Sequence, residues 1–346
     1  AIRQDRQDYD LPPGGPLPPP LSKTVVSGAP EVVFPALPQL TEAHIPHHPL
    51  IAAQAQPWPG QLAAVRSPGN DGFELVTNFS TRARIGTLTN DLWSGPVSRF
   101  DHGNVMIVDL VTGTLESVTD TALLSGANAL AVESAPGIWE VLQAGSAELI
   151  APGRYRLTRL LRGQRGTEGA MADPVPAGAR VVVLDSMLAD LPVTEADLGM
   201  AMNWRIGPAS RPVSDETYVA QTFTPEGVGL RPFAPVHVEQ PWRKARVAGD
   251  LTIRWVRRDR SLAADSWNAV EIPMSEASES WQVEILDGAT VKRSLTTATT
   301  SVVYSAADQS ADWGAPLGSG NALTVRIAQI GQMFGAGAAL TTTLWF

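Results

Sequence analysis

Short apolar runs separated by turn-forming residues fill the sequence between residues 62 and 184. They are 73–76, 84–88, 105–110, 129–132, 138–142, 153–168 and 180–184, with Gly, Asn, Asp and Pro between them. A spacing of about ten residues is typical of antiparallel strands joined by tight turns. The intervals are too short for the helical crossovers that parallel strands need. This pattern predicts an antiparallel β barrel or sandwich, and it argues against a doubly wound nucleotide-binding fold.

Composition narrows the class of protein further. With 346 residues, of which 44% are hydrophobic and 18% charged, the chain is expected to be globular and to have more than one domain. Its 26 basic and 35 acidic side chains give a net charge of −9, which argues against a nucleic-acid partner. The absence of cysteine excludes disulfides and cysteine metal sites within the chain. No apolar run is long enough to predict a membrane span.

Proline recurs through residues 11–60, which predicts an extended arm over residues 1–60 because proline fixes φ and removes an amide donor. The arm is either a strap laid over another domain or subunit, or a solvated linker. The apolar residues Val32, Val33, Phe34 and Leu37 favour the strap. Because the chain opens on this arm, we expect it to be a piece of a longer polypeptide.

Three histidines lie in the arm, at His44, His47 and His48. Prolines interrupt them and no paired carboxylate is evident in the sequence, so no metal site is expected.

Residues 61–186 are expected to form the β domain, and residues 187–235 a connecting segment with Thr194 as a helix N-cap and a proline-stiffened elbow at 225–235. Residues 236–346 form a second predicted β unit. Its runs 251–257 and 281–288 alternate as half-buried strands do, and its length suits one immunoglobulin-like sandwich. The positions of Trp255, in the second predicted strand, and of Tyr304, before the penultimate one, resemble those of the aromatic residues in fibronectin type III domains.

The stretch 153–168 combines a half-buried strand with a tight turn. Tyr155, Leu157 and Leu160 form its apolar side, and glycines then break the run because they reach positive φ without steric cost. The predicted structural turn consists of Arg162, Gly163, Arg165, Gly166, Thr167 and Glu168. We expect both arginines to fasten this turn through backbone carbonyls or carboxylates, and not to grip a substrate.

Three phrases in a fixed order carry a family resemblance. They are Leu-Leu-Ser-Gly-Ala-Asn-Ala at 123–129, Trp-Glu-Val-Leu-Gln-Ala at 139–144, and Leu-Leu-Arg-Gly-Gln-Arg-Gly-Thr-Glu at 160–168. Over residues 60–346 the chain resembles the C-terminal region of the large tail-tip (host-specificity, baseplate hub-associated) protein of gene transfer agents and related siphophages.

This resemblance implies a structural component of a tail tip or baseplate in a virion or virion-like particle. It implies assembly with copies of itself, expected as a trimer, and with other tail-tip or baseplate proteins. Tail fibres and host surface polysaccharide are further expected partners. The large proteins of this family carry a hydrolase-like domain upstream of the matching region, so that activity is not carried over.

The residues give little sign of catalysis. A Gly-x-Ser-x-Gly nucleophile motif is absent, and the glycines at 163–166 are not followed by the Gly-Lys-Ser/Thr of a phosphate loop. A glycosidase would need two carboxylates across a cleft, for which Asp101, Asp109, Glu133 and Glu140 are available. We expect no catalytic residue and no cofactor. The alternatives are a secreted carbohydrate-active enzyme or a carbohydrate-binding adhesin, each with a fibronectin-like module.

A basic and aromatic cluster stands out in this acidic chain: Arg231, Trp242, Arg243, Lys244, Arg246, Arg254, Arg257, Arg258 and Arg260. Within it, Trp242, Arg243, Lys244 and Arg246 are the candidate surface for a glycan or lipopolysaccharide. The favoured alternative is that the arginines pair with Glu239, Asp250, Asp259 and neighbouring subunits. The Gly- and Ala-rich run 331–339 would allow close approach of another chain, or form an ordinary hairpin loop.

Overall fold

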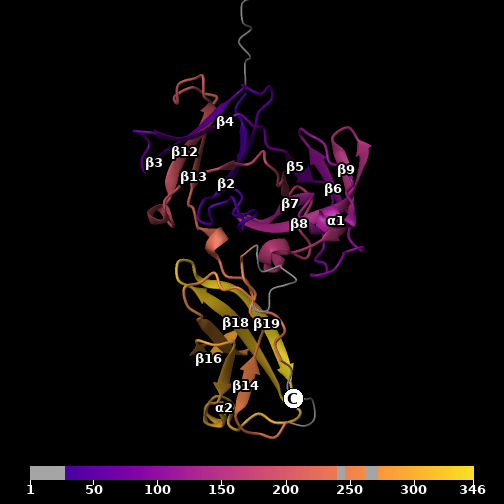
Figure 1. Cartoon of the computed structure of the whole chain (residues 1–346), viewed down its shortest axis with the longest axis vertical. Coiled ribbons are helices and arrows are strands. Elements are labelled where there is room, and N and C mark those ends of the chain that lie inside the picture. The colour runs from indigo at the N-terminus through magenta and orange to yellow at the C-terminus, as the bar shows by residue number, and fades with distance from the viewer. Residues whose placement is uncertain (1–27, 240–245, 262–271) are drawn as a thin grey trace, which may run out of the picture.

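The computed structural model describes residues 28–239, 246–261 and 272–346, and Figure 1 shows a mainly β molecule in which a C-terminal unit lies beneath two upper β bodies. The helices are short. They are α1 (Asp120–Leu124), α2 (Ala306–Trp313) and the 3-10 turns η2 (Gln164–Gly166), η3 (Glu168–Ala170), η4 (Glu195–Asp197) and η5 (Val228–Leu230). Across the described ranges, every helix is too short or too polar to cross a membrane.

Six antiparallel strands close into a barrel, in the order β10-β5-β6-β9-β8-β7. They are β5 (Ile85–Leu88), β6 (Met106–Leu110), β7 (Ala129–Ala135), β8 (Ile138–Ala151), β9 (Arg154–Leu161) and β10 (Arg180–Val183). Alternate side chains such as Leu88, Met106, Leu142 and Val181 are fully buried and fill the interior. The predicted antiparallel β architecture is confirmed, and of the two forms expected, barrel or sandwich, it is the barrel.

A backbone irregularity explains how Tyr155, Leu157 and Leu160 all face the barrel core although their spacing breaks a strict alternation. Arg159 adopts a φ of 58°, which shifts the side-chain alternation by one residue. Leu160 is therefore fully buried, and the guanidinium of Arg159 reaches Asp120 at the surface.

Two further sheets lie beside the barrel. One has the order β1-β2-β11, and the other has the order β13-β12-β3-β4. Their strands are β1 (Glu31–Val33), β2 (Leu50–Gln54), β3 (Leu62–Ser67), β4 (Glu74–Phe79), β11 (Ala189–Asp190), β12 (Met202–Pro208) and β13 (Val219–Phe223).

The strands of these sheets come from both sides of the domain boundaries expected from the sequence. β3, expected within the first β domain, pairs with β12 from the expected connecting segment, and β4 pairs with the other side of β3. In β12, Met202, Trp204 and Ile206 are buried while Asn203 and Arg205 are half-buried, so this segment has the alternation of a strand. Thr194 does precede η4 as its N-cap, and its backbone amide donates to Oδ2 of Asp197 at 2.8 Å.

The described part of the expected arm, residues 28–60, is a packed part of the fold. It supplies β1 and β2, and β2 is the central strand of its sheet. Val32 and Val33 are buried, and Phe34 stacks on Phe223 with ring centroids 4.5 Å apart. The apolar residues that favoured a strap therefore cover this chain's own sheets, whereas residues 1–27 lie outside the described ranges.

The C-terminal unit, residues 236–346, has two sheets around one core. The strands are β14 (Leu251–Arg254), β15 (Trp281–Asp287), β16 (Thr290–Thr297), β17 (Ser301–Tyr304), β18 (Ala322–Gly331) and β19 (Gly335–Trp345). β14 pairs with β17, and the other sheet has the order β16-β15-β18-β19. Leu251 and Ile253 of the first sheet share a core with Trp281, Val283 and Ile285 of the second, which confirms the predicted alternation.

Candidate functional site

The turn at residues 162–168, hereafter the Arg–Gly turn, has a backbone that leaves little room for other sequences. Gly163, Arg165 and Gly166 have φ values of 58°, 57° and 76°. A Cβ on Gly163 would lie 2.7 Å from the Cα of Glu168, and a Cβ on Gly166 would lie 2.4 Å from Cδ1 of Phe233. Both glycines are therefore required by conformation and by close approach.

Arg162 lies inside the barrel with a side chain that is 0% exposed. Its Nε and one terminal nitrogen donate to the two carboxylate oxygens of Glu140 at 2.7 and 2.8 Å, and its other terminal nitrogen donates to the backbone oxygen of Trp93 at 2.8 Å. Asp101 lies 3.5 Å from that second nitrogen. This is a buried cation held by two carboxylates, in the bidentate geometry that suits a guanidinium.

Asp101 holds the loop that follows β5 against this cation. Burial alone would raise the pKa of its carboxyl, but hydrogen bonds from Asn104 and Gly103, together with the charge of Arg162, hold the pKa below its usual value. The carboxylate accepts from the backbone amides of Gly103 and Asn104 at 3.0 and 3.1 Å. The inner half of the site is thus a closed network of charge-assisted hydrogen bonds.

Two further contacts fasten the Arg–Gly turn to β8. The amide of Gly163 donates to Oε1 of Glu140 at 3.1 Å. The hydroxyl of Thr167 donates to the backbone oxygen of Gln164 at 2.7 Å and accepts from the amide of Val141 at 2.9 Å. Thr167 is 1% exposed, so its hydroxyl supplies partners to backbone groups that water does not reach.

The outer half of the turn faces the C-terminal unit. Arg165 donates to the backbone oxygens of Gln39 at 3.1 Å and Arg260 at 2.8 Å. Glu168 forms an ion pair with Arg258. Two guanidiniums lie over the ring of Phe233, with Cζ 5.7 Å from its centroid for Arg165 and 5.4 Å for Arg258.

The elbow is held from the other side as well. Ala338 donates its amide to the backbone oxygen of Pro232 at 2.9 Å, and a Cβ on Gly337 would lie 2.7 Å from Cβ of Pro232. The small residues of run 331–339 therefore allow close approach of the elbow of the same chain. Pro232 contacts the C-terminal unit and Phe233 contacts the Arg–Gly turn. These two adjacent residues therefore bridge the barrel and the C-terminal unit, which adjoin in Figure 1.

The structure places the candidate surface-binding residues in two groups. Trp242, Arg243 and Lys244 lie outside the described residues. Arg246 donates to the backbone oxygens of Leu317 and Gly249 at 3.0 and 2.8 Å, and its guanidinium lies over the ring of Phe346. Burial lowers the pKa of Arg246. Its cation therefore fastens the C-terminal unit internally.

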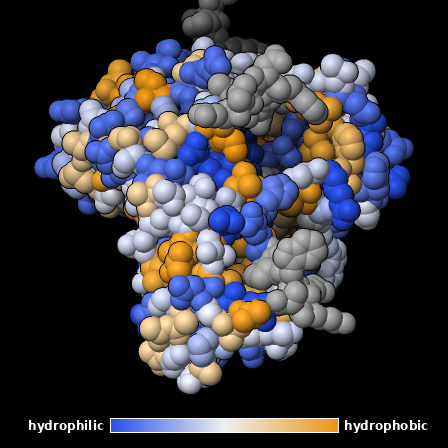
Figure 2. Space-filling model, turned by 60° about the horizontal axis from the view of Figure 1, so that its bottom comes forward, coloured by the Kyte–Doolittle hydropathy of each residue, from blue (hydrophilic) through white to orange (hydrophobic). Residues whose placement is uncertain are grey.

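Other arginines of the basic cluster have acidic partners, although mostly different ones from those expected. Arg254 pairs with Glu239 at 3.6 Å, Arg257 with Glu279 at 3.1 Å and Arg260 with Glu276 at 3.2 Å. Asp259 instead accepts from Ser275 and the amide of Ser261. Figure 2, in which the bottom of the molecule comes forward, shows a mixed surface with hydrophobic groups between hydrophilic ones.

The four acidic residues available for glycoside hydrolysis are engaged by arginines. Asp101 and Glu140 contact Arg162, as described above. Asp109 accepts two hydrogen bonds from Arg154 at 2.5 and 2.6 Å, and these bonds lower its pKa. Burial would raise the pKa of Glu133, but hydrogen bonds from Arg180 and Gly137 lower it overall.

The histidines of residues 44–48 have local partners. Nδ1 of His48 lies 3.1 Å from a carboxylate oxygen of Asp190, and the rings of His47 and His48 meet edge to face. Within the described ranges, no group of three or more His, Asp or Glu side chains is arranged to hold a metal ion.

Fold and site together define a mainly β protein whose barrel is joined to a C-terminal β unit through the Arg–Gly turn. A family model described as Rcc01698-like, C-terminal matches residues 83–182, which coincide with the barrel strands. The name of this family is associated with gene transfer agents, so the match is compatible with a protein related to them. No curated protein matches the chain.

Among solved structures, the glycoside hydrolase domain of Endo-D (Spr0440) from Streptococcus pneumoniae R6 is 10% identical, with a TM-score of 0.21. The match covers 78% of this chain and 34% of that one, so the chain spans about a third of its length. A similarity at this level carries no argument about fold or activity.

Proposed function

We propose that this chain is a structural component of a phage-like tail tip or baseplate, where it scaffolds the tip and contributes to host-cell attachment or fibre anchoring. One observation carries the proposal. The phrase on which the family resemblance most depends, at residues 160–168, holds a buried ion pair inside the barrel through Arg162 and contacts the C-terminal unit through Arg165 and Glu168. A scaffold needs such rigid joints, because forces and partners act across them.

The C-terminal unit supports this reading as a fibronectin type III-like module. Its two sheets enclose one core, Trp255 packs against Trp281 with ring centroids 5.3 Å apart, and Tyr304 is fully buried. The sandwich architecture needs no cysteine pair, and the chain has no cysteine. Modules of this kind are suited to presenting surfaces away from a body.

The proposed partners are other tail-tip or baseplate proteins, copies of this chain in a trimer, tail fibres and host surface polysaccharide. Exposed apolar side chains support protein partners. Leu75, Leu124 and Leu149 are 59%, 71% and 61% exposed on the upper bodies.

Localisation in purified particles tests the proposal. A tagged chain is expected at the tail tip by immunogold labelling, and a particle reconstruction is expected to fit the barrel and the C-terminal unit there. Recovery of the chain as a free cytosolic monomer, with particles lacking it, would overturn the assignment.

An enzymatic alternative is tested on the same preparation. A general acid in glycoside hydrolysis needs a raised pKa, whereas Asp101, Asp109 and Glu133 have lowered ones. We expect no turnover of envelope polysaccharide by the purified chain. Turnover that is abolished by a single Asp or Glu substitution would favour a carbohydrate-active enzyme over a scaffold.

A further inference from the structure

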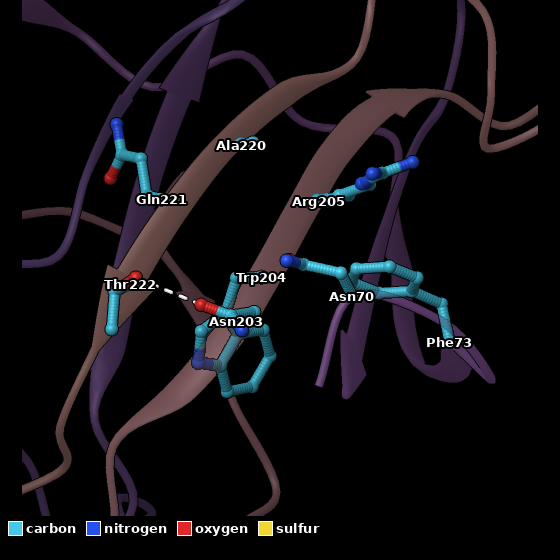
Figure 3. Close-up of a pocket in the computed structure, with 8 residues that line it drawn as sticks. All are labelled: Asn70, Phe73, Asn203, Trp204, Arg205, Ala220, Gln221 and Thr222. Carbon is cyan, nitrogen blue, oxygen red and sulfur yellow. Dashed lines mark hydrogen bonds between the residues drawn. The ribbon is translucent and has the colours of Figure 1, made fainter. Parts of the chain in front are cut away.

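A polar depression on the outer face of the sheet β13-β12-β3-β4 lies apart from the Arg–Gly turn. It has a volume of about 220 Å³ and is shown in Figure 3. The alternation of β12 and β13 turns Asn203, Arg205 and Thr222 outward, and the turn between β3 and β4 adds Asn70 and Phe73. The volume is below the roughly 300 Å³ at which pockets for drug-sized ligands begin, so it suits a single small ring.

Arg205 is the charged group of this depression. Its guanidinium lies over the Phe73 ring, 4.5 Å from the ring centroid, and donates to the backbone oxygen of Val213 at 3.4 Å. Arg66 and Arg211 of the same body pair with Asp197 and Asp215, both at 3.0 Å. Across the described ranges no such ion pair forms with Arg205, so its remaining N–H donors are available for an anion.

Amide and hydroxyl groups surround this cation. Asn203 donates from Nδ2 to the backbone oxygen of Gly69 at 3.0 Å, and its Oδ1 accepts from the hydroxyl of Thr222 at 2.9 Å. The first bond fastens the turn between β3 and β4 to β12, and the second joins β12 to β13. The side chain of Asn70 is exposed and forms no hydrogen bond with another described residue, which leaves both its donors and its acceptor for a ligand.

We propose that this depression binds an anionic sugar, with Arg205 holding the sugar's carboxylate and Asn70 its hydroxyl groups. A guanidinium binds a carboxylate through two parallel hydrogen bonds, and amides match the mixed donor and acceptor pattern of sugar hydroxyls. A neutral sugar would leave Arg205 unpaired. This inference rests on the proposed function, which supplies the source of the sugar. It deepens that function by assigning a ligand class to an attachment surface.

Calorimetric titration of the full chain tests the site with three probes: trigalacturonate, maltotriose and glucose 6-phosphate. Trigalacturonate is expected to bind at least tenfold more tightly than maltotriose, and its affinity is expected to fall as salt is raised, because the contact is ionic and solvent-facing. A preference for glucose 6-phosphate over trigalacturonate would overturn the assignment of a carboxylate as the anion that Arg205 holds. Equal affinity for all three probes, or no binding, would overturn the proposal.

Arg205→Gln is expected to weaken trigalacturonate binding at least tenfold, and Asn70→Ala about threefold. The matched control is Arg254→Gln, an exposed arginine on the C-terminal unit, which should leave affinity unchanged. Should Arg205→Gln fail to fold, Asn70→Ala decides the outcome, because the exposed Asn70 side chain bonds to no other described residue; unchanged affinity would then overturn the proposal. Since the assay uses purified chain, absence of the chain from particles would reject the proposed function without affecting this result.

Discussion

Arg162 and Arg165 belong to one turn and have opposite environments. Arg162 is 1% exposed and bonds to carboxylates within the barrel, whereas Arg165 bonds to backbone oxygens of Gln39 and Arg260 outside it. The first arginine neutralises buried charge, and the second joins segments distant in the sequence. A single short phrase therefore serves the interior of one body and its attachment to the next.

This difference in environment predicts a difference in consequence. Loss of a buried cation leaves carboxylates without a partner in a medium that solvates them poorly, and that cost is large. Loss of a half-buried cation removes hydrogen bonds that water replaces in part. Substitutions in the inner half should therefore unfold the barrel, and those in the outer half should loosen the joint.

Arg162→Ala is expected to have the largest effect, a loss of about 3 to 5 kcal/mol in the free energy of unfolding, because Glu140 and Asp101 become unpaired buried charges. Urea unfolding of the full chain measures it. Arg156→Ala is the control, since Arg156 pairs with Glu148 at 3.6 Å on the surface, and such pairs contribute about 0 to 1 kcal/mol. Equal losses in the two variants would show that the Arg162 network is not a special source of stability.

Gly166→Ala should have the next largest effect. Gly166 and Gly137 both have a φ of 76°, but a Cβ on Gly137 meets nothing within 4 Å, whereas one on Gly166 meets the Phe233 ring. Backbone strain is therefore common to both variants, and the steric cost of about 1 to 3 kcal/mol belongs to Gly166→Ala alone. We expect Gly166→Ala to increase proteolytic cleavage near the elbow. If Gly137→Ala has the same effect, the contact with Phe233 does not hold the joint.

The sequence predicted the barrel strands well because each one alternates and is bounded by turn residues. It indicated that Arg162 and Arg165 would bond to carbonyls or carboxylates, but not which ones, because Glu140, Trp93, Gln39 and Arg260 are brought together only by tertiary packing. The alternation of Met202, Trp204 and Ile206 is typical of a strand, and it forms β12 within residues 187–235, which the sequence predicts as a connecting segment. The depression at Arg205 has no sequence motif, since it depends on strand pairing between β12 and β13 and on the folded turn of residues 67–73.

Arg165→Ala is expected to cost about 1 to 2 kcal/mol, from two hydrogen bonds to carbonyls and one cation–π contact. Stability or assembly should fall, while any ligand affinity of the last domain stays unchanged. A double-mutant cycle with Phe233→Leu measures the coupling between the two side chains. Loss of ligand binding by the full chain on this substitution, at unchanged folding, would contradict a purely structural role.

A smaller, pH-dependent effect extends the comparison to the C-terminal unit. The Tyr304 hydroxyl donates to Oδ2 of Asp312 at 2.7 Å and accepts from Nε1 of Trp313 at 2.9 Å. Burial, and then the hydrogen bond to Asp312, raises the pKa of Tyr304 above its usual value. Because the folded-state pKa is raised, the resulting stability is complete below about pH 10 and is lost as the pH rises further.

The barrel has the opposite dependence through Asp101. Its lowered pKa gives stability that is present above about pH 4 and is lost as the pH falls through the folded-state value. Tyr304→Phe should therefore shift the alkaline unfolding of the C-terminal unit to higher pH and leave acid unfolding of the barrel unchanged. Amide exchange in β15 and β8 follows the C-terminal unit and the barrel separately, and Tyr218→Phe, at the residue before β13, is the control. An unchanged alkaline transition in Tyr304→Phe would show that ionisation of this buried phenol does not limit the stability of the C-terminal unit.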